Sequence, residues 1–106
     1  MLKHVILWQF NDDLPDEQKE ELKQQIQDDL EALPGKIPGL IDVNVYIDGL
    51  PTSNADWFLD VTLESKAALE VYAKHPDHVA VAERLIFPNC KTRLCMDFEV
   101  GRFEQH

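Results

Sequence analysis

The side chains best suited to chemistry are concentrated in one segment of the 106-residue sequence, Val71 to Ala80. The segment contains Tyr72 and two of the four histidines, His75 and His78. An imidazole titrates near neutral pH and a phenol donates a hydrogen bond, so these groups suit general acid–base work on a carbonyl compound. We therefore predict that His78 removes a proton and that Tyr72 donates a hydrogen bond to the developing oxyanion.

A proline, Pro76, interrupts the helical pattern of this segment. The residue before a proline avoids helical dihedral angles, so one helix is expected to end here and a second to run from Pro76 to about Ile86. Because the chain changes direction at the break, Tyr72 and His78 can point into the same cleft. We predict that this cleft lies between the helices and a sheet, with His4 of the first strand facing it.

Two other interpretations of these residues stay open. In the first, His4 and His78 are buried, hydrogen-bonded core residues, and Tyr72 packs with its hydroxyl at the rim of the core. In the second, His75 and His78 share a helix face and bind a metal ion together with Asp77 and His4. No cysteine or other third ligand stands at a fixed spacing from them, so we expect no metal.

The rest of the sequence predicts the elements that hold this segment. Apolar residues at every second position indicate strands, and apolar residues at spacings of three and four indicate helices. The strands are expected over 3–10, 40–47, 56–64 and 92–103, and the helices over about 15–33, 66–74 and 76–86. In the second strand the alternation places four side chains on one face: Ile41, Val43, Val45 and Ile47.

The order strand, helix, strand, strand, broken helix, strand is the βαββαβ pattern of a ferredoxin-like α+β fold. It predicts a four-stranded antiparallel sheet with both helical regions on one face. The other face would carry Val5, Leu7, Tyr46 and Phe58, which is too much apolar surface to leave in water. We therefore expect a homodimer formed by packing two such sheets together.

Length, charge and composition limit the function. We expect a single domain over residues 1–106. The net charge of -10 repels phosphate backbones and anionic lipids, so neither nucleic acid nor a membrane is an expected partner. The four glycines form no phosphate-binding loop, so no nucleotide cofactor is expected. Without a visible secretory signal, Cys90 and Cys95 are expected as reduced thiols of a cytoplasmic protein, on opposite faces of the last strand.

Three segments of the chain form a family signature when taken in this order of strands and helices. They are Lys3-His4-Val5-Ile6-Leu7, Asn54-Ala55-Asp56 and the motif Tyr72-x-x-His75-Pro76-x-His78. With them the sequence resembles the stress-responsive A/B barrel (Dabb) domains of the dimeric α+β barrel superfamily, over almost its whole length. The resemblance implies a homodimer in which the two sheets form a barrel with the helices outside.

The resemblance also implies a kind of reaction. In a plant polyketide cyclase of the family, olivetolic acid cyclase, the catalytic tyrosine and histidine match Tyr72 and His78, and a first-strand histidine matches His4. That enzyme has another histidine on its third strand, where this chain has Trp57. If the chain is an enzyme, we expect a cofactor-free, cyclase-like or isomerase-like acid–base catalyst that uses Tyr72, His78 and His4. The substrate-binding candidates are Trp8, Trp57, Leu59, Val79 and His75.

Two further functions remain as alternatives. One is a non-catalytic dimeric stress or scaffold protein in which the same residues serve packing. The other, cofactor-free oxygenation, follows from analogy with other dimeric barrels alone. The enzymatic interpretation predicts an enclosed pocket between the sheet and the second helical region, which the packing interpretation does not require.

Overall fold

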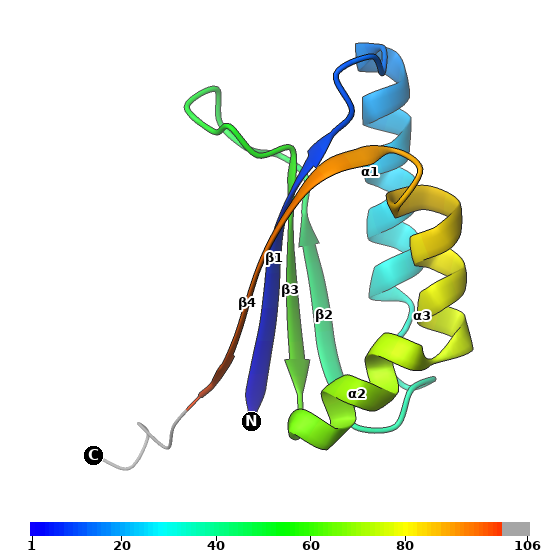
Figure 1. Ribbon diagram of the computed structural model, residues 1–106, viewed down its shortest axis with the longest axis vertical. Helices are drawn as coiled ribbons and strands as arrows, with labels where there is room; N and C mark the ends of the chain where they lie inside the picture. Colours follow the sequence, from blue (N-terminus) through cyan, green and yellow to red (C-terminus); the bar gives the residue numbers. More distant parts are fainter. Residues whose placement is uncertain (101–106) are drawn as a thin grey trace.

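A four-stranded antiparallel sheet with its helices on one side forms the computed structural model, which describes residues 1–100 (Figure 1). In chain order the elements are β1 (Leu2–Phe10), α1 (Asp16–Glu31), β2 (Leu40–Tyr46), β3 (Trp57–Leu63), α2 (Lys66–Lys74), α3 (Pro76–Val81), the π-helical turn η1 (Ala82–Ile86) and β4 (Cys90–Glu99). The strand order is β2-β3-β1-β4. This confirms the predicted ferredoxin-like fold. The last strand was predicted to reach Phe103, but residues 101–106 lie outside the described part.

The helix α1 covers the sheet with one apolar stripe. Leu22, Ile26 and Leu30 follow each other at spacings of four, so they share a face, and all three are buried. Polar side chains of the same helix reach the outer edge of β2. The amide of Gln27 donates to the carbonyl of Val45 at 3.0 Å, and the carboxylate of Glu31 accepts from the Val45 N–H at 2.9 Å. Within residues 1–100 no helix is long and apolar enough to cross a membrane.

The predicted faces of the second strand need one correction, at Ile41. Leu40 pairs with Leu63, whereas Asp42 already pairs with the adjacent Thr62, so Ile41 is an extra residue in this register. Such a bulge shifts the alternation of the strand by one position. Ile41 is accordingly 43% exposed, although the sequence pattern placed it with the core-facing residues.

The two cysteines also lie differently from the prediction. Cys90 pairs with Phe10 and Cys95 with Ile6, and both partners are core residues of β1. A register shift leaves Lys91 as an extra residue between them, so Cys90 and Cys95 both pack against the core instead of facing opposite ways. Both are free thiols, as expected.

The break in the second helical region is well defined. The hydroxyl of Ser65 caps α2 by accepting a hydrogen bond from the Ala68 N–H at 3.2 Å. At the other end of α2, His75 has an extended backbone (φ -65°, ψ 133°), and Pro76 then starts α3. The Nδ1 atom of His75 accepts from the Asp77 N–H at 3.1 Å, so His75 caps the new helix. The change of direction therefore occurs where the sequence predicted it.

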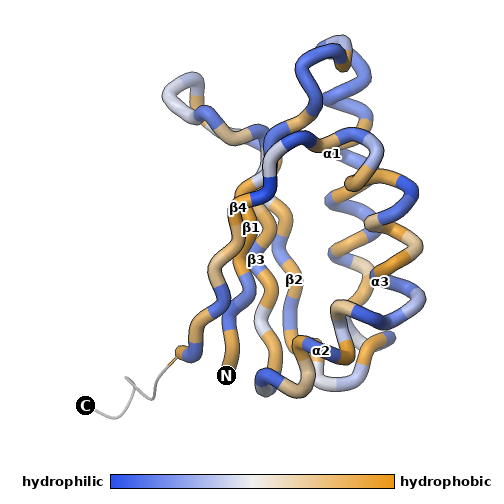
Figure 2. The backbone as a smooth tube through the Cα atoms, viewed as in Figure 1, coloured by the Kyte–Doolittle hydropathy of each residue, from blue (hydrophilic) through white to orange (hydrophobic). Residues whose placement is uncertain are grey.

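The face of the sheet opposite the helices carries a bare apolar surface. Five of its side chains are exposed apolar or aromatic residues: Leu7, Tyr46, Leu94, Met96 and Phe98. Figure 2 shows hydrophobic residues along all four strands, although the helices cover one side of the sheet only. The open apolar face expected from the sequence is therefore present in this chain.

Candidate functional site

Tyr72 lies at the centre of the residues predicted to do chemistry. It comes from α2, is 1% exposed, and its ring centroid lies 4.2 Å from that of His78 on α3. The ring of His4 on β1 is 6.1 Å away and meets it edge-on. Folding thus brings together the three side chains that the sequence singled out, and the break at Pro76 is what allows Tyr72 and His78 to meet.

The hydroxyl of Tyr72 is buried and has no hydrogen-bond partner among residues 1–100. Most buried polar groups are paired, so an unpaired hydroxyl marks a place where a partner is missing. Burial also raises the pKa of Tyr72 above its ordinary value. The phenol therefore stays protonated at neutral pH and can donate its hydrogen bond to a ligand oxygen.

His78 is held in one tautomer by the backbone. Its Nδ1 atom lies 3.3 Å from the carbonyl oxygen of Ala73, and a carbonyl only accepts, so Nδ1 carries the proton. In the neutral ring Nε2 is then an unprotonated acceptor. Burial lowers the pKa of His78, and the charges of His4, Arg93 and His75 lower it further, against the opposing effect of the Ala73 carbonyl. A neutral ring of this kind can accept a proton at physiological pH.

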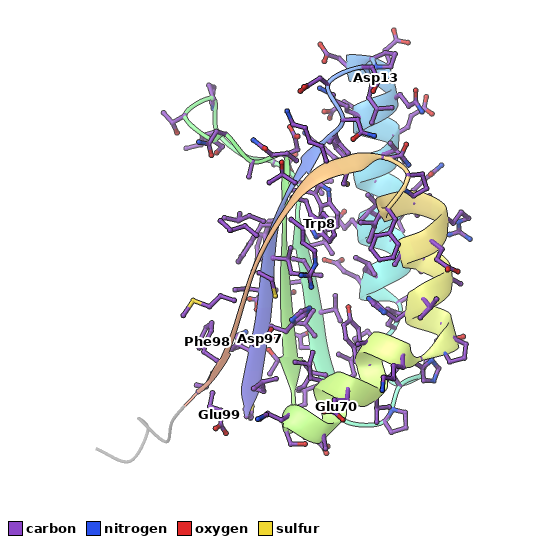
Figure 3. All side chains as sticks on the ribbon, viewed as in Figure 1. Trp8, Asp13, Glu70, Asp97, Phe98 and Glu99 are labelled. Atoms are coloured by element: carbon purple, nitrogen blue, oxygen red, sulfur yellow. The ribbon has the colours of Figure 1, made fainter. Side chains whose placement is uncertain are left out.

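Asp97 is a site residue that the sequence analysis missed. Its carboxylate is hydrogen-bonded to Nδ1 of His4, and the two residues lie directly opposite each other in the β1–β4 pair. Figure 3 shows Asp97 on the helix side of β4 and Phe98 on the other side. The carboxylate fixes the proton on Nδ1 and leaves Nε2 of His4 as the free nitrogen. Only the register of β1 and β4 identifies this partner, because alternation along a strand says which face a side chain takes and not what lies opposite it.

Cys95 and Arg93 stand on the same face of β4 as Asp97. The sulfur of Cys95 lies 3.7 Å from Nδ1 of His4 and 3.6 Å from the Asp97 carboxylate. The guanidinium of Arg93 lies 5.9 Å from the ring centroid of Trp8, close enough for a cation–π contact. A cationic and a thiol group therefore border the histidine–carboxylate pair.

Most of the predicted substrate-binding residues belong to the core. Trp8 and Trp57 stack with ring centroids 5.4 Å apart, and both are buried, as is Leu59. Figure 3 shows Trp8 in the layer between the sheet and the helices. Val79 is partly exposed on α3, and His75 is partly exposed at the cap of that helix.

The residues whose ligand atoms lie close together in the structure differ from those of the predicted metal site. Within residues 1–100, His75, Asp77 and His78 do not form a group with ligand atoms in mutual reach. The group that does is His4, Cys95 and Asp97, whose ligand atoms all lie within 4.8 Å of one another.

The main surface hollows of the described chain lie away from Tyr72. One of about 340 Å³ lies on the open face, and it is lined by Val5, Leu7, Phe58, Leu94, Cys95 and Met96. A second, of about 320 Å³, lies beside it under the loop over 48–56. Neither of these two hollows is the enclosed pocket predicted between the sheet and the second helical region. At that place the rings of Tyr72 and His78 pack against each other.

Comparison with solved structures gives relatives of the same fold and length. A dimeric protein of unknown function with a ferredoxin-like fold from Bacteroides fragilis is 28% identical, with a TM-score of 0.88, and the match covers 93% of this chain and 95% of that chain. A dimeric ferredoxin-like protein from Thermobifida fusca is 27% identical, with a TM-score of 0.77 and coverage of 93% and 90%. Hydroxynitrile lyase from Passiflora edulis shares the fold at 16% identity, with a TM-score of 0.74 and coverage of 94% and 93%.

Comparison with sequence families gives one match that spans nearly the whole described chain. No curated protein matches the chain significantly. The family model of the Stress Responsive A/B Barrel Domain (Dabb) matches residues 2–100, which include the first-strand histidine and the motif around Pro76. The chain therefore belongs to the stress-responsive A/B barrel (Dabb) domain family.

Proposed function

We propose that the protein is a homodimer that binds a small carbonyl or aromatic compound and acts on it by acid–base chemistry. The binding residues are those of the Tyr72 site, which consists of Tyr72, His78, His4 and Asp97. The solved relatives from Bacteroides fragilis and Thermobifida fusca are dimeric proteins of the same fold. The bare apolar face of the sheet supports the same assembly for this chain, because two such faces can cover each other.

One observation carries the proposal, the buried Tyr72 hydroxyl without a partner. Leaving a buried donor unsatisfied costs about 1–3 kcal/mol, and a packing residue gains nothing from that cost because phenylalanine would fill the same space. A ligand oxygen placed against the hydroxyl would remove the penalty. The cost is therefore explained if Tyr72 is kept for a bound carbonyl or enolate oxygen.

The surrounding groups divide the chemistry of an enolisation between them. The neutral Nε2 of His78 accepts a proton from the carbon next to the carbonyl, and the oxygen that becomes negative receives the hydrogen bond of Tyr72. The proton then returns from His78 to carbon or oxygen of the product. The Asp97 carboxylate keeps Nε2 of His4 available as a second acceptor. No electron or group has to be supplied from outside.

Entry to the site requires movement of His78. Tyr72 is almost fully buried, whereas His78 is partly exposed and lies on the short helix after the proline break. Displacing the His78 ring from the Tyr72 ring, which it contacts at 4.2 Å, opens the space that a flat ligand would fill. A flat aromatic or enolic compound suits this gap because it can replace the ring-to-ring contact.

The test is deuterium exchange at carbon. Phenylacetone, acetophenone and acetylacetone are incubated with the protein in deuterated buffer, and loss of the proton signals next to the carbonyl is followed by NMR. Wild type and the Tyr46→Phe control should exchange at least one probe faster than buffer does. Tyr72→Phe and His78→Gln should each lose about 100-fold or more of that excess rate. Exchange no faster than buffer for all three probes, with no shift of the Tyr72 ring signals, would refute the proposal.

A second function is favoured by the absence of Tyr72 from the lining of the two hollows described above. A non-catalytic dimeric protein would use the Tyr72–His78 contact for packing alone. In that case His78→Ala lowers the free energy of unfolding, and no probe shifts the Tyr72 signals. Loss of probe binding with normal stability in His78→Ala argues for the catalytic function instead.

A further inference from the structure

We propose that His4, Cys95 and Asp97 form a binding site for a divalent transition-metal ion, with zinc as the favoured ion. The ligand atoms are Nδ1 of His4, the sulfur of Cys95 and one carboxylate oxygen of Asp97. This site lies next to the Tyr72 site and shares His4 and Asp97 with it, but the proposal does not depend on catalysis.

Two of the three distances between the ligand atoms fit a tetrahedral ion. With a zinc–sulfur bond of about 2.3 Å and bonds to nitrogen and oxygen of about 2.0–2.1 Å, two ligand atoms of one zinc ion lie about 3.3–3.6 Å apart. The sulfur of Cys95 is 3.7 Å from Nδ1 of His4 and 3.6 Å from the Asp97 carboxylate. Only the hydrogen-bonded contact between His4 and Asp97 is shorter. It has to widen by about 1 Å when an ion replaces the shared proton.

The strands hold the three ligands in register. His4 and Asp97 are directly opposite each other in the β1–β4 pair, and Cys95 is two residues before Asp97, so its side chain lies on the same face of the sheet. A site built on paired strands needs little rearrangement to bind an ion. It also contains one thiolate, one imidazole and one carboxylate ligand, a mixture that suits zinc better than magnesium or calcium.

The electrostatic surroundings favour exchange of a proton for a cation. The chain carries a net charge of -10, and Arg93 is the cation that acts on Cys95 from its own strand. A metal ion replaces the proton of the Cys95 thiol and supplies the positive charge that the thiolate needs.

Three protein ligands leave one position of the ion for water or another small ligand. The buried, unpartnered hydroxyl of Tyr72 belongs to the same region, since its ring lies 6.1 Å from the ring of His4. Metal binding removes the hydrogen bond between His4 and Asp97, so metal-bound and metal-free protein present different neighbours to Tyr72. The two forms should therefore be assayed separately.

Cobalt titration tests the site directly, because Co²⁺ is a coloured substitute for zinc. Metal-free wild-type protein at about pH 7.5 should gain a sulfur-to-cobalt charge-transfer band and intense visible bands of a tetrahedral ion, saturating at one ion per chain. Cys95→Ser should abolish the charge-transfer band. Cys90→Ser is the matched control, because its thiol is outside the group, and it should keep the band. Asp97→Asn should weaken cobalt binding more than about ten-fold, and zinc should displace the cobalt.

Three results would overturn the site. They are absence of a charge-transfer band in wild type, survival of the band in Cys95→Ser, and a weak octahedral spectrum that reports surface carboxylates only. Circular dichroism of each variant excludes loss of fold as the reason for a missing band. Deuterium exchange measured with a chelator present separates the two proposals. If cobalt does not bind, the exchange rate measured with the chelator should still be that expected for the Tyr72 site. If the protein does not speed exchange, the cobalt spectrum should still appear.

Discussion

Nδ1 of His4 and the carboxylate of Asp97 are hydrogen-bonded across the β1–β4 pair, where the two residues lie directly opposite each other. The bond fixes the tautomer of the buried His4 ring, because a proton held on Nδ1 leaves Nε2 unprotonated. Its cost is low because paired strands already place the two side chains side by side.

Asp97→Asn should change the tautomer of His4 and leave the fold intact. An amide oxygen binds the Nδ1 proton less strongly than a carboxylate, so the neutral ring loses its fixed preference. We expect the nitrogen NMR signals of His4, recorded in the presence of a chelator, to move from the Nδ1-protonated pattern toward a mixture. Glu99→Gln removes a charge from the same face of β4 and serves as the control. An unchanged His4 pattern in Asp97→Asn would contradict the orienting role.

Tyr72→Phe should leave the free energy of unfolding unchanged or raise it by up to about 1 kcal/mol. The variant keeps the ring and removes a buried hydroxyl that has no partner, so it relieves an unsatisfied group. Urea denaturation of the ligand-free protein measures the difference, with Tyr46→Phe, the other tyrosine of the chain, as the control. A loss of about 1 kcal/mol or more would mean that the hydroxyl is hydrogen-bonded in the folded chain.

Protonation of His78 should destabilise the fold as the pH falls. Burial lowers the pKa of His78 in the folded chain, with His4, Arg93 and His75 adding to the effect and the Ala73 carbonyl opposing it. Between the lowered value and the ordinary value of about 6.5, the unfolded chain binds more protons, so stability decreases with decreasing pH. Above about pH 6.5 the contribution is complete. His78→Gln should flatten this slope between about pH 7.5 and 5.5, whereas a slope equal to that of wild type contradicts the lowered pKa.

Leu94→Asp should convert the proposed dimer into monomers. Leu94 is 67% exposed on the open face, and in a two-fold symmetric dimer each substitution occurs twice. Losing about 2 kcal/mol of apolar burial in each copy weakens association roughly a thousand-fold. Light scattering after size-exclusion chromatography measures the mass. Leu50→Asp, in the loop after β2, is the control and should remain dimeric; a dimeric Leu94→Asp protein would place the interface elsewhere.

The sequence determines most of the fold because the alternation of β1 and β3 is regular, and because Ser65 and Pro76 mark the helix boundaries by local chemistry. Prediction from the sequence fails where one strand carries an extra residue relative to the strand it pairs with. Nothing in the local pattern reveals the bulges at Ile41 and Lys91, since each depends on which residue the neighbouring strand offers.

The candidate site, like the fold, could be predicted from the sequence only in part. Tyr72 and His78 could be predicted from their place around the proline. The partnership of His4 with Asp97 could not, because it connects strands at opposite ends of the chain. The contribution of Cys95 was missed for the same reason, since its distance from His4 depends on that register.

The contacts of Gln27 and Glu31 with the backbone of Val45 also limit how copies of this protein can associate. If a strand of another copy paired with β2, the N–H and the carbonyl of Val45 would not be free to bond with it, because Glu31 and Gln27 already bind them. Side-by-side growth into fibres is therefore obstructed at that edge, where an open strand would invite it. Two copies that stack by their bare apolar faces leave no such face for a third, so this mode of association stops at a pair.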